Sequence, residues 1–188
     1  KSCAALADAT ELWLGAHFDK PLTLAHWRTL GMLVGCGPLP RLAMLAINGS
    51  DDGDEGVALL ADGLRRGRLP SLRMLGLVRA QIGPQGATAL APALTKRALP
   101  SVEVISLYQN PLGDAGLAAL LPALRQLPPL KALDLGGIDI TDEGVASLVA
   151  QPTAGARESL AVLRLTRNEI TDSGCATLAS ALRGGKLL

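Results

Sequence analysis

The stretch Leu130-Lys-Ala-Leu133-Asp-Leu135, with Gly144 and Leu148 behind it, contains the pattern that decides the fold. Leu133 and Leu135 alternate with other residues at period two, which is typical of a strand with one buried face. Gly144 and Leu148 stand four positions apart, which is helical spacing. The stretch therefore predicts a short strand, then a turn, then a helix.

The same pattern recurs at regular intervals along the chain. It starts at residues 42, 72, 102, 130 and 160, so successive starts lie 30, 30, 28 and 30 residues apart. One such unit cannot bury its own apolar side, so neighbouring units must stack to form a core. The composition agrees with one small packing unit used many times, because 48% of the residues are hydrophobic and only 2% are aromatic.

The consensus LxxLxLxxNxLxxxGxxxLxxxL of these units resembles the leucine-rich repeat of the ribonuclease-inhibitor subtype, which also occurs in the repeat domains of NLR-type immune receptors. The resemblance covers residues 39–188 and implies an α/β fold. That fold is a curved solenoid, a segment of a horseshoe, with parallel strands on the concave face and helices on the convex face.

On this resemblance we expect five repeats after a degenerate N-terminal repeat or cap at residues 1–38. The five repeats are expected at residues 39–68, 69–98, 99–126, 127–158 and 159–188. In the N-terminal unit, Leu12, Leu14 and His17 fit the strand register, and a helix is expected through Leu24–Val34. The last five residues look like the opening of another repeat, so we expect the C-terminal end to be truncated or covered by another protein.

The family's asparagine after the strand, which bonds backbone groups of adjacent turns, is present only at Asn110 and Asn168. Ser50, Ala80 and Ile138 occupy the equivalent positions. This patchy presence predicts looser turns at 80 and 138 without a change of fold.

Helix starts are marked by Thr141 and Thr171 as caps followed by acids, and by Pro84 in a first turn. The recurrent glycine in the first helical turn costs about 1 kcal/mol of helix propensity. Its recurrence predicts that a side chain there would collide with the neighbouring strand or helix. We interpret residues 31–37 as the break that ends a helix, and Cys175 as a small buried residue.

Outward strand positions are predicted to line the concave face in three rows. The first row is Glu11, Met44, Met74, Val104, Ala132 and Val162. The second row is Trp13, Ala46, Gly76, Ser106, Asp134 and Arg164. The third row is Gly15, Asn48, Val78, Tyr108, Gly136 and Thr166. A solvated face without function should be polar, whereas the first row is nearly all apolar, and contiguous exposed apolar area marks an interaction site.

We therefore predict a partner-binding concave face. Its candidate residues are Trp13, Met44, Asn48, Met74, Val78, Arg79, Val104, Tyr108, Asp134, Val162, Arg164 and Arg167. Trp13 and Tyr108 would act as anchors, the methionines as adaptable contacts, and the arginines as groups that hold acidic side chains. The alternative interpretation is that small outward residues merely relieve crowding where the strands curve inward.

The sequence gives little support for catalysis or metal binding. His17 and His26 lack a convincing Cys or Ser nucleophile motif. Residues 50–55 (SDDGDE) form the densest carboxylate cluster, but they lack the EF-hand order and lead into a helix, which favours a solvated turn over a calcium site. No phosphate-binding glycine motif is present. We predict no catalytic residue, no metal and no cofactor.

Charge and cysteine content limit the partners. The net charge of +1 argues against nucleic-acid binding. No window reaches about 18 consecutive apolar residues, so no transmembrane segment is predicted. Cys3, Cys36 and Cys175 are too few and too scattered for a disulfide framework. This favours the cytoplasm or another reducing compartment, and the sequence does not identify the compartment further.

Charges are sorted along the repeats, with acids at helix starts and bases at helix ends. The acids are Asp51, Asp52, Asp54, Glu55, Asp114, Asp139, Asp142, Glu143 and Asp172. The bases are Arg65, Arg66, Arg68, Lys96, Arg97, Arg125, Arg157, Arg183 and Lys186. Stacking would turn these into two opposite edges. The pattern fits repeated complementation of helix dipoles, and it also fits a basic edge that docks an anionic lipid surface or an acidic partner.

Together these features predict a non-enzymatic protein-binding or scaffold module that holds a protein partner on the concave strand face. The alternative is a structural subunit or fragment of a larger receptor or multiprotein assembly, docked by a charged edge or by an open end of the solenoid.

Overall fold

The computed structural model describes residues 8–15, 21–37, 39–67, 69–150 and 160–184. Strands and helices alternate along the chain, and we call one strand with its following helix a coil. The elements are β1 (Glu11–Gly15), α1 (Leu24–Gly35), β2 (Met44–Asn48), α2 (Gly53–Arg66), β3 (Met74–Val78), α3 (Pro84–Leu90), the 3-10 turn η2 (Ala91–Ala93), β4 (Val104–Ser106), α4 (Gly113–Leu124), β5 (Ala132–Asp134), α5 (Asp142–Val149), β6 (Val162–Arg164) and α6 (Asp172–Arg183).

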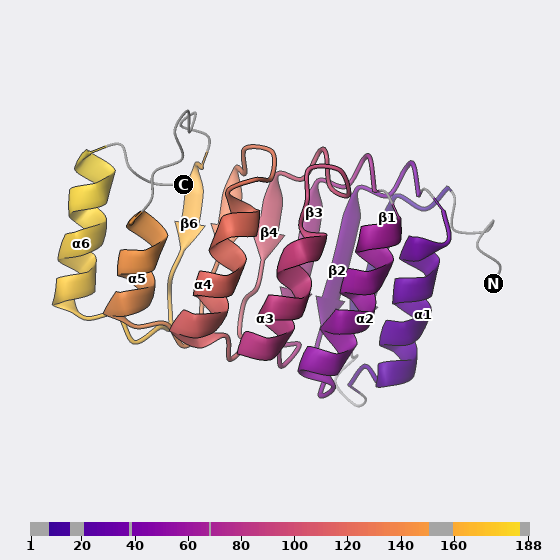
Figure 1. Cartoon of the computed structure of the whole chain (residues 1–188), viewed down its shortest axis with the longest axis horizontal. Helices are drawn as coiled ribbons and strands as arrows, with labels where there is room; N and C mark the ends of the chain where they lie inside the picture. The colour runs from indigo at the N-terminus through magenta and orange to yellow at the C-terminus, as the bar shows by residue number, and fades with distance from the viewer. Residues whose placement is uncertain (1–7, 16–20, 38, 68, 151–159, 185–188) are drawn as a thin grey trace.

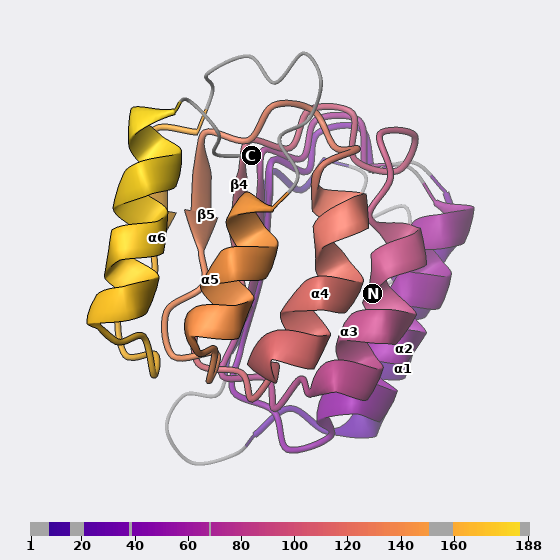
Figure 2. The same ribbon diagram turned by 60° about the vertical axis from the view of Figure 1, so that its left-hand side comes forward.

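The six parallel strands form one sheet in chain order (Figure 1). The register places equivalent repeat positions side by side, so that Leu12 pairs with Leu45 and Leu45 with Leu75. The helices cover one face of this sheet and run back against the strand direction (Figures 1 and 2). Helix ends and strand starts therefore share one edge of the molecule. The chain is the curved α/β solenoid that the repeat pattern predicted.

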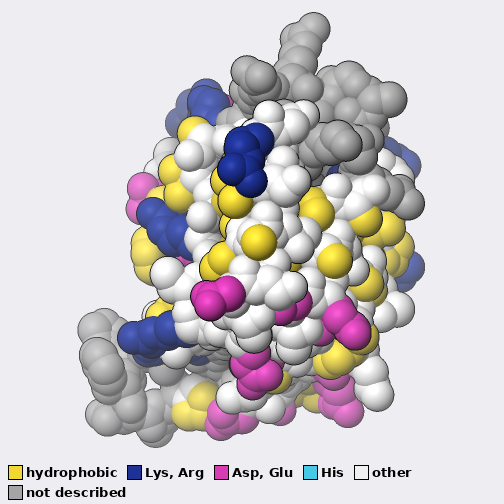
Figure 3. Space-filling view, turned by 90° about the vertical axis from the view of Figure 1, so that its left-hand side faces the viewer, with side chains coloured by type: hydrophobic (Ala, Val, Ile, Leu, Met, Phe, Trp, Pro, Cys, Tyr) yellow, Lys and Arg dark blue, Asp and Glu magenta, His cyan; other side chains and the backbone are white. Residues whose placement is uncertain are grey.

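A continuous spine of leucine side chains fills the space between the sheet and the helices. Leu45, Leu133 and Leu135 in this spine are completely buried. Burial falls in the sixth coil, where Leu163 and Leu165 occupy the positions of Leu133 and Leu135 but are only partly buried. The end of the solenoid formed by β6 and α6 therefore shows hydrophobic side chains among polar ones (Figure 3).

The turns after the strands are held by asparagines that reach back to the preceding coil. The Asn110 Oδ1 accepts hydrogen bonds from the backbone amides of Ala80 and Ile82 at 3.0 and 3.1 Å, and its Nδ2 donates to two carbonyls at 2.7 Å. Asn168 bonds the turn at Ile138 in the same way. The expectation of looser turns at 80 and 138 was wrong, because the asparagine of the following coil satisfies each of these turns.

Acidic side chains join successive helix starts. Asp114 accepts hydrogen bonds from the backbone amide of Thr141 at 2.9 Å and from its hydroxyl at 2.6 Å. Asp142 bonds Thr171 in the same way. A Cβ atom on Gly144 would collide with the Asp114 carboxylate, and glycines of two other coils repeat this relation. The recurrent glycine thus avoids a collision, as predicted, and the group it makes room for includes the aspartate of the preceding coil, which bonds the residue just before the helix.

The first two helices approach each other through glycines. A Cβ on Gly31 would collide with the carbonyl of Leu59, and a Cβ on Gly63 would collide with the carbonyl of Gly31. Residues 31–37 do end the helix, at Gly35, but Gly31 lies inside it and permits this close packing.

A buried hydrogen bond ties the first coil to the second. Trp27 is 1% exposed, and its Nε1 donates to Ser50 Oγ at 2.8 Å. Ser50 Oγ in turn donates to the carbonyl of Leu22 at 3.0 Å. We give the name inter-coil clamps to six of the side chains that bond a neighbouring coil. They are Trp27, Asp54, Asn110, Asp114, Asp142 and Asn168.

Cys175 is exposed, against our expectation, although it occupies the position of the fully buried Val145. The reason is that no further described coil packs on that side of α6.

Within the described ranges no helix is long and apolar enough to cross a membrane.

Candidate functional site

The concave face carries the three predicted rows, and the strand register places them side by side. The first row pairs Glu11, Met44, Met74, Val104, Ala132 and Val162 in order. The second pairs Trp13, Ala46, Gly76, Ser106, Asp134 and Arg164. The third row starts with Gly15, Asn48 and Val78. It continues at Tyr108, whose carbonyl accepts from the Arg79 amide at 2.9 Å.

The apolar first row is less exposed than its composition suggested. Met44, Met74, Val104 and Ala132 are half-buried, and Val162 at the end of the sheet is 38% exposed. Strands about 4.8 Å apart bring equivalent side chains into contact along the row, so they shield one another. The row is therefore a half-buried apolar ridge.

Small buried residues of the second row form a floor beside this ridge. Ala46 is 6% exposed, Ser106 is 8% exposed, and Gly76 between them is buried. We call these three positions the trough. Trp13, 62% exposed, stands at one end of the row, and Asp134 continues it at the other. The trough thus lies between two rows of larger side chains and runs across the strands.

A tyrosine and an arginine that are far apart in sequence meet at the rim of this face. Arg167 Nη1 donates to the Tyr108 hydroxyl at 3.0 Å. The ring of Tyr108 lies against Gly136, where a Cβ would be 3.0 Å from Tyr108 Cδ2. The missing side chain at Gly136 therefore lets the ring lie over the next coil, within reach of Arg167.

The residue after the third row adopts a left-handed backbone conformation in coil after coil. Gly49 and Gly137 occupy this position, and so do Arg79, Gln109 and Arg167 with φ values of 50°, 55° and 59°. Left-handed backbone is unfavourable for residues with a Cβ, so these three side chains are held at the rim by the surrounding turn. Arg79 Nε donates to Gln109 Oε1 at 2.5 Å. Sequence reasoning missed Gln109, although its spacing from Arg79 was a usable signal.

The remaining predicted residues lie on the same face without forming one cluster. Asn48 and Arg164 are exposed, and Val78 is half-buried. Asp134 Oδ1 accepts from the amide of Gly136 at 3.1 Å, so its carboxylate partly serves the local turn.

Two residues considered for catalysis or metal binding, His26 and Asp54, make hydrogen bonds to the backbone. His26 Nδ1 accepts from the Thr23 amide at 3.1 Å at the start of α1, and His17 lies outside the described residues. Asp54 accepts from the Gly83 amide at 2.7 Å. Among the described side chains, no three His, Cys, Asp or Glu groups are placed to share a metal ion. A shallow hollow between α5 and α6 is lined by small, apolar and hydroxyl-bearing residues.

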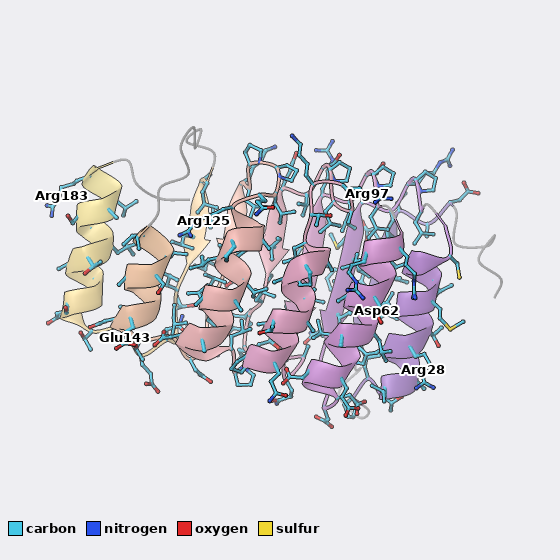
Figure 4. All side chains as sticks on the ribbon, viewed as in Figure 1. Arg28, Asp62, Arg97, Arg125, Glu143 and Arg183 are labelled. Carbon is cyan, nitrogen blue, oxygen red and sulfur yellow. The ribbon has the colours of Figure 1, made fainter. Side chains whose placement is uncertain are left out.

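The two edges of the solenoid differ in charge, as Figure 4 shows for Arg97 and Arg183 on one edge and Glu143 on the other. The basic edge, at helix ends and strand starts, consists of Arg41, Arg65, Arg66, Arg73, Lys96, Arg97, Lys131 and Arg183. The acidic edge, at strand ends and helix starts, consists of Asp51, Asp52, Asp54, Glu55, Asp114, Asp139, Asp142, Glu143, Glu169 and Asp172. The predicted separation of charge is therefore present in the described residues. Arg125 follows α4 on the basic edge and is half-buried, whereas Arg68, Arg157 and Lys186 lie outside the described residues.

Comparison with known proteins supports the repeat interpretation. Residues 126–149 and 158–179 match the Leucine Rich repeat family. The solved structure of leiomodin-1 actin-binding site 2 (ABS2) is similar to this chain, with a TM-score of 0.56 and 16% sequence identity. The similarity covers 87% of this chain and 90% of that chain. No curated protein matches the sequence. At this identity the likeness shows a common fold.

Proposed function

We propose that this leucine-rich repeat chain is a non-enzymatic protein-binding or scaffold module that holds a protein partner on its concave strand face. The observation that carries the proposal is the trough between the apolar ridge and the third row. Apolar side chains of a partner that enter the trough would contact Met44, Met74 and Val104 on one side. They would contact Val78 and Tyr108 on the other side. Aromatic and methionine side chains are frequent anchors of such contacts.

The rim adds a charge preference to this apolar contact. Arg167 uses one N–H group on Tyr108, and a guanidinium carries five, so donors remain for a carboxylate of the partner. Arg79 and Arg164 extend the same preference, and the exposed ring of Trp13 offers an anchor at the far end. The partner is therefore a protein segment that combines an apolar ridge with an acidic group near Tyr108.

The family relationship supports binding as the class of function. The coils from β2 onwards repeat every 28 to 30 residues with one α-helix each, which supports membership of the ribonuclease-inhibitor-like subtype. The similar leiomodin-1 structure is named as an actin-binding site, which makes a solenoid of this fold a protein-binding surface in that protein. For this chain the partner is defined by the chemistry of the trough and rim.

The trough can be blocked without disturbing the fold. A Cβ on Gly76 would have no neighbour closer than 3.6 Å, so Gly76→Arg places a long side chain over the trough at little structural cost. Peptides selected from a displayed library on the wild-type chain should bind the variant about tenfold more weakly or worse in calorimetry. Ala118→Arg on the exposed side of α4 is the matched control. Equal binding by Gly76→Arg and by Tyr108→Ala with Met74→Lys would contradict the concave-face proposal.

A second candidate is a structural subunit that docks through the open end or a charged edge. The partly buried Leu163 and Leu165 favour it, because they leave apolar surface at the β6–α6 end. In that case Gly76→Arg leaves association with the partner unchanged. Charge reversal at Arg65, Arg66 and Arg97 would abolish docking by the basic edge.

A further inference from the structure

Helix dipoles account for only part of the basic edge. Basic residues occur in the last turn of α2, as Arg65 and Arg66, and of α6, as Arg183. The last turns of α1, α3, α4 and α5 contain none. Arg97 and Lys131 lie in loops, outside any helix. A dipole interaction fades beyond the final turn, so most of this edge needs another explanation.

The acids beside the basic edge neutralise only a fraction of its charge. Glu103 bonds both Arg73 Nη1 at 2.8 Å and Lys131 Nζ at 3.0 Å, so this trio keeps one positive charge. The hydrogen bond from Lys131 is the main cause of the lowered pKa of Glu103, which keeps the trio in this charge state. Asp8 pairs with Arg41 at 3.3 Å.

Several bases on this edge have no acidic partner among the described residues. They are Arg66, Lys96, Arg97 and Arg183, and all four are exposed. Together with the trio around Glu103 they leave a row of solvated positive charge along the whole length of the solenoid. Such a row attracts anionic material over a Debye length of about 10 Å at moderate salt.

The shape of the edge selects among anionic partners. It follows the stacked coils in one line (Figure 1). An acidic peptide needs fixed hydrogen-bonding groups or a groove to be recognised, whereas a lipid surface presents charge spread over a plane. Large exposed apolar side chains occur at both ends of the same edge. Met32 is 57% exposed near the end of α1, and Leu182 is 60% exposed near the end of α6.

We propose that the basic edge rests on an anionic lipid surface, with its arginine and lysine groups at the level of the headgroup phosphates. Met32 and Leu182 contact the membrane interface at the two ends. This orientation stands the solenoid on its edge and leaves the concave face open, so lipid contact and partner binding are compatible. The proposal does not depend on the proposed function, because the two use different residues.

Vesicle sedimentation with the whole chain tests the proposal. The chain should bind vesicles of phosphatidylcholine with about 30% phosphatidylserine, should not bind phosphatidylcholine alone, and should dissociate as salt rises. The triple variant Arg66→Gln, Lys96→Gln, Arg97→Gln should bind about 100-fold more weakly, since each surface charge contributes about fivefold.

A matched control removes the same charge elsewhere. Arg28→Gln, Arg79→Gln, Arg164→Gln loses three positive charges away from the basic edge and should bind vesicles like the wild type. Equal loss in both triple variants, or no preference for phosphatidylserine, would overturn the proposal. So would binding to soluble poly-L-glutamate as tight as to vesicles, which would instead assign the edge to an acidic protein. Circular dichroism of each variant separates these outcomes from unfolding.

Discussion

Replacing Asn110 by alanine tests whether the clamps hold neighbouring coils together. The Asn110 side chain is 1% exposed and makes four hydrogen bonds of 2.7–3.1 Å, two of them to amides of the preceding coil. Alanine leaves the amides of Ala80 and Ile82 buried without a partner, at about 1–3 kcal/mol each, while the two carbonyls lose one bond apiece. We expect the free energy of unfolding to fall by about 4 kcal/mol. Urea titration followed by far-UV circular dichroism measures this change.

Asn168 provides a control with the same chemistry in a different setting. It makes the same four bonds but is only partly buried in the sixth coil, where water can replace lost partners. Asn168→Ala should therefore cost about half as much. Asn110→Asp keeps both acceptor bonds but sets a buried carboxylate oxygen against the carbonyls of Leu77 and Leu107, so it should cost at least as much as alanine. A loss below about 1 kcal/mol for Asn110→Ala, or a larger loss for Asn168→Ala, would refute the clamp argument.

Three further changes probe other contacts. Gly63→Ala places a Cβ against the carbonyl of Gly31 and should lower stability by about 3 kcal/mol, whereas Gly37→Ala, with open space around it, should change the melting temperature little. Hydrogen bonds from the threonine that begins α6 lower the pKa of Asp142, so its stabilising effect is present above the unfolded pKa and is lost as pH falls through the folded pKa. Asp142→Asn should flatten the loss of stability below about pH 4 in acid titrations. Trp27→Phe removes a buried donor and should cost about 1–2 kcal/mol in urea unfolding, and a neutral result would show that water replaces the bond.

The sheet could be predicted from the sequence because two periods determine it. Side chains alternate faces every second residue, and the repeat places equivalent residues opposite each other in a parallel sheet. These two facts predict the pairing of Met44 with Met74 and of Ala46 with Gly76, and the register confirms both. The binding role of these residues stays a prediction.

The errors arose where one coil acts on another. The expectation of a looser turn at 80 considered only the residue within that turn, whereas the side-chain oxygen of Asn110 bonds it from the following coil. Cys175 has the pattern of a buried residue, but burial at that position requires a further coil on α6. The exposure of Met74 likewise depends on its neighbours in adjacent strands, and the left-handed φ of Gln109 comes from the turn around it.

The inter-coil clamps also divide each coil into a part of constant length and a part whose length varies. Twelve positions separate the first outward strand residue from the helix glycine in every regular coil, as from Met44 to Gly56. The return from that glycine to the next strand takes 18 positions in three coils and 16 from Gly116 to Ala132. Most clamps lie in the constant part, so insertions there would detach one coil from the next. The segment from the helix glycine to the next strand, by contrast, varies in length. It should accept a loop inserted after Arg97 without a change in the register of the strands.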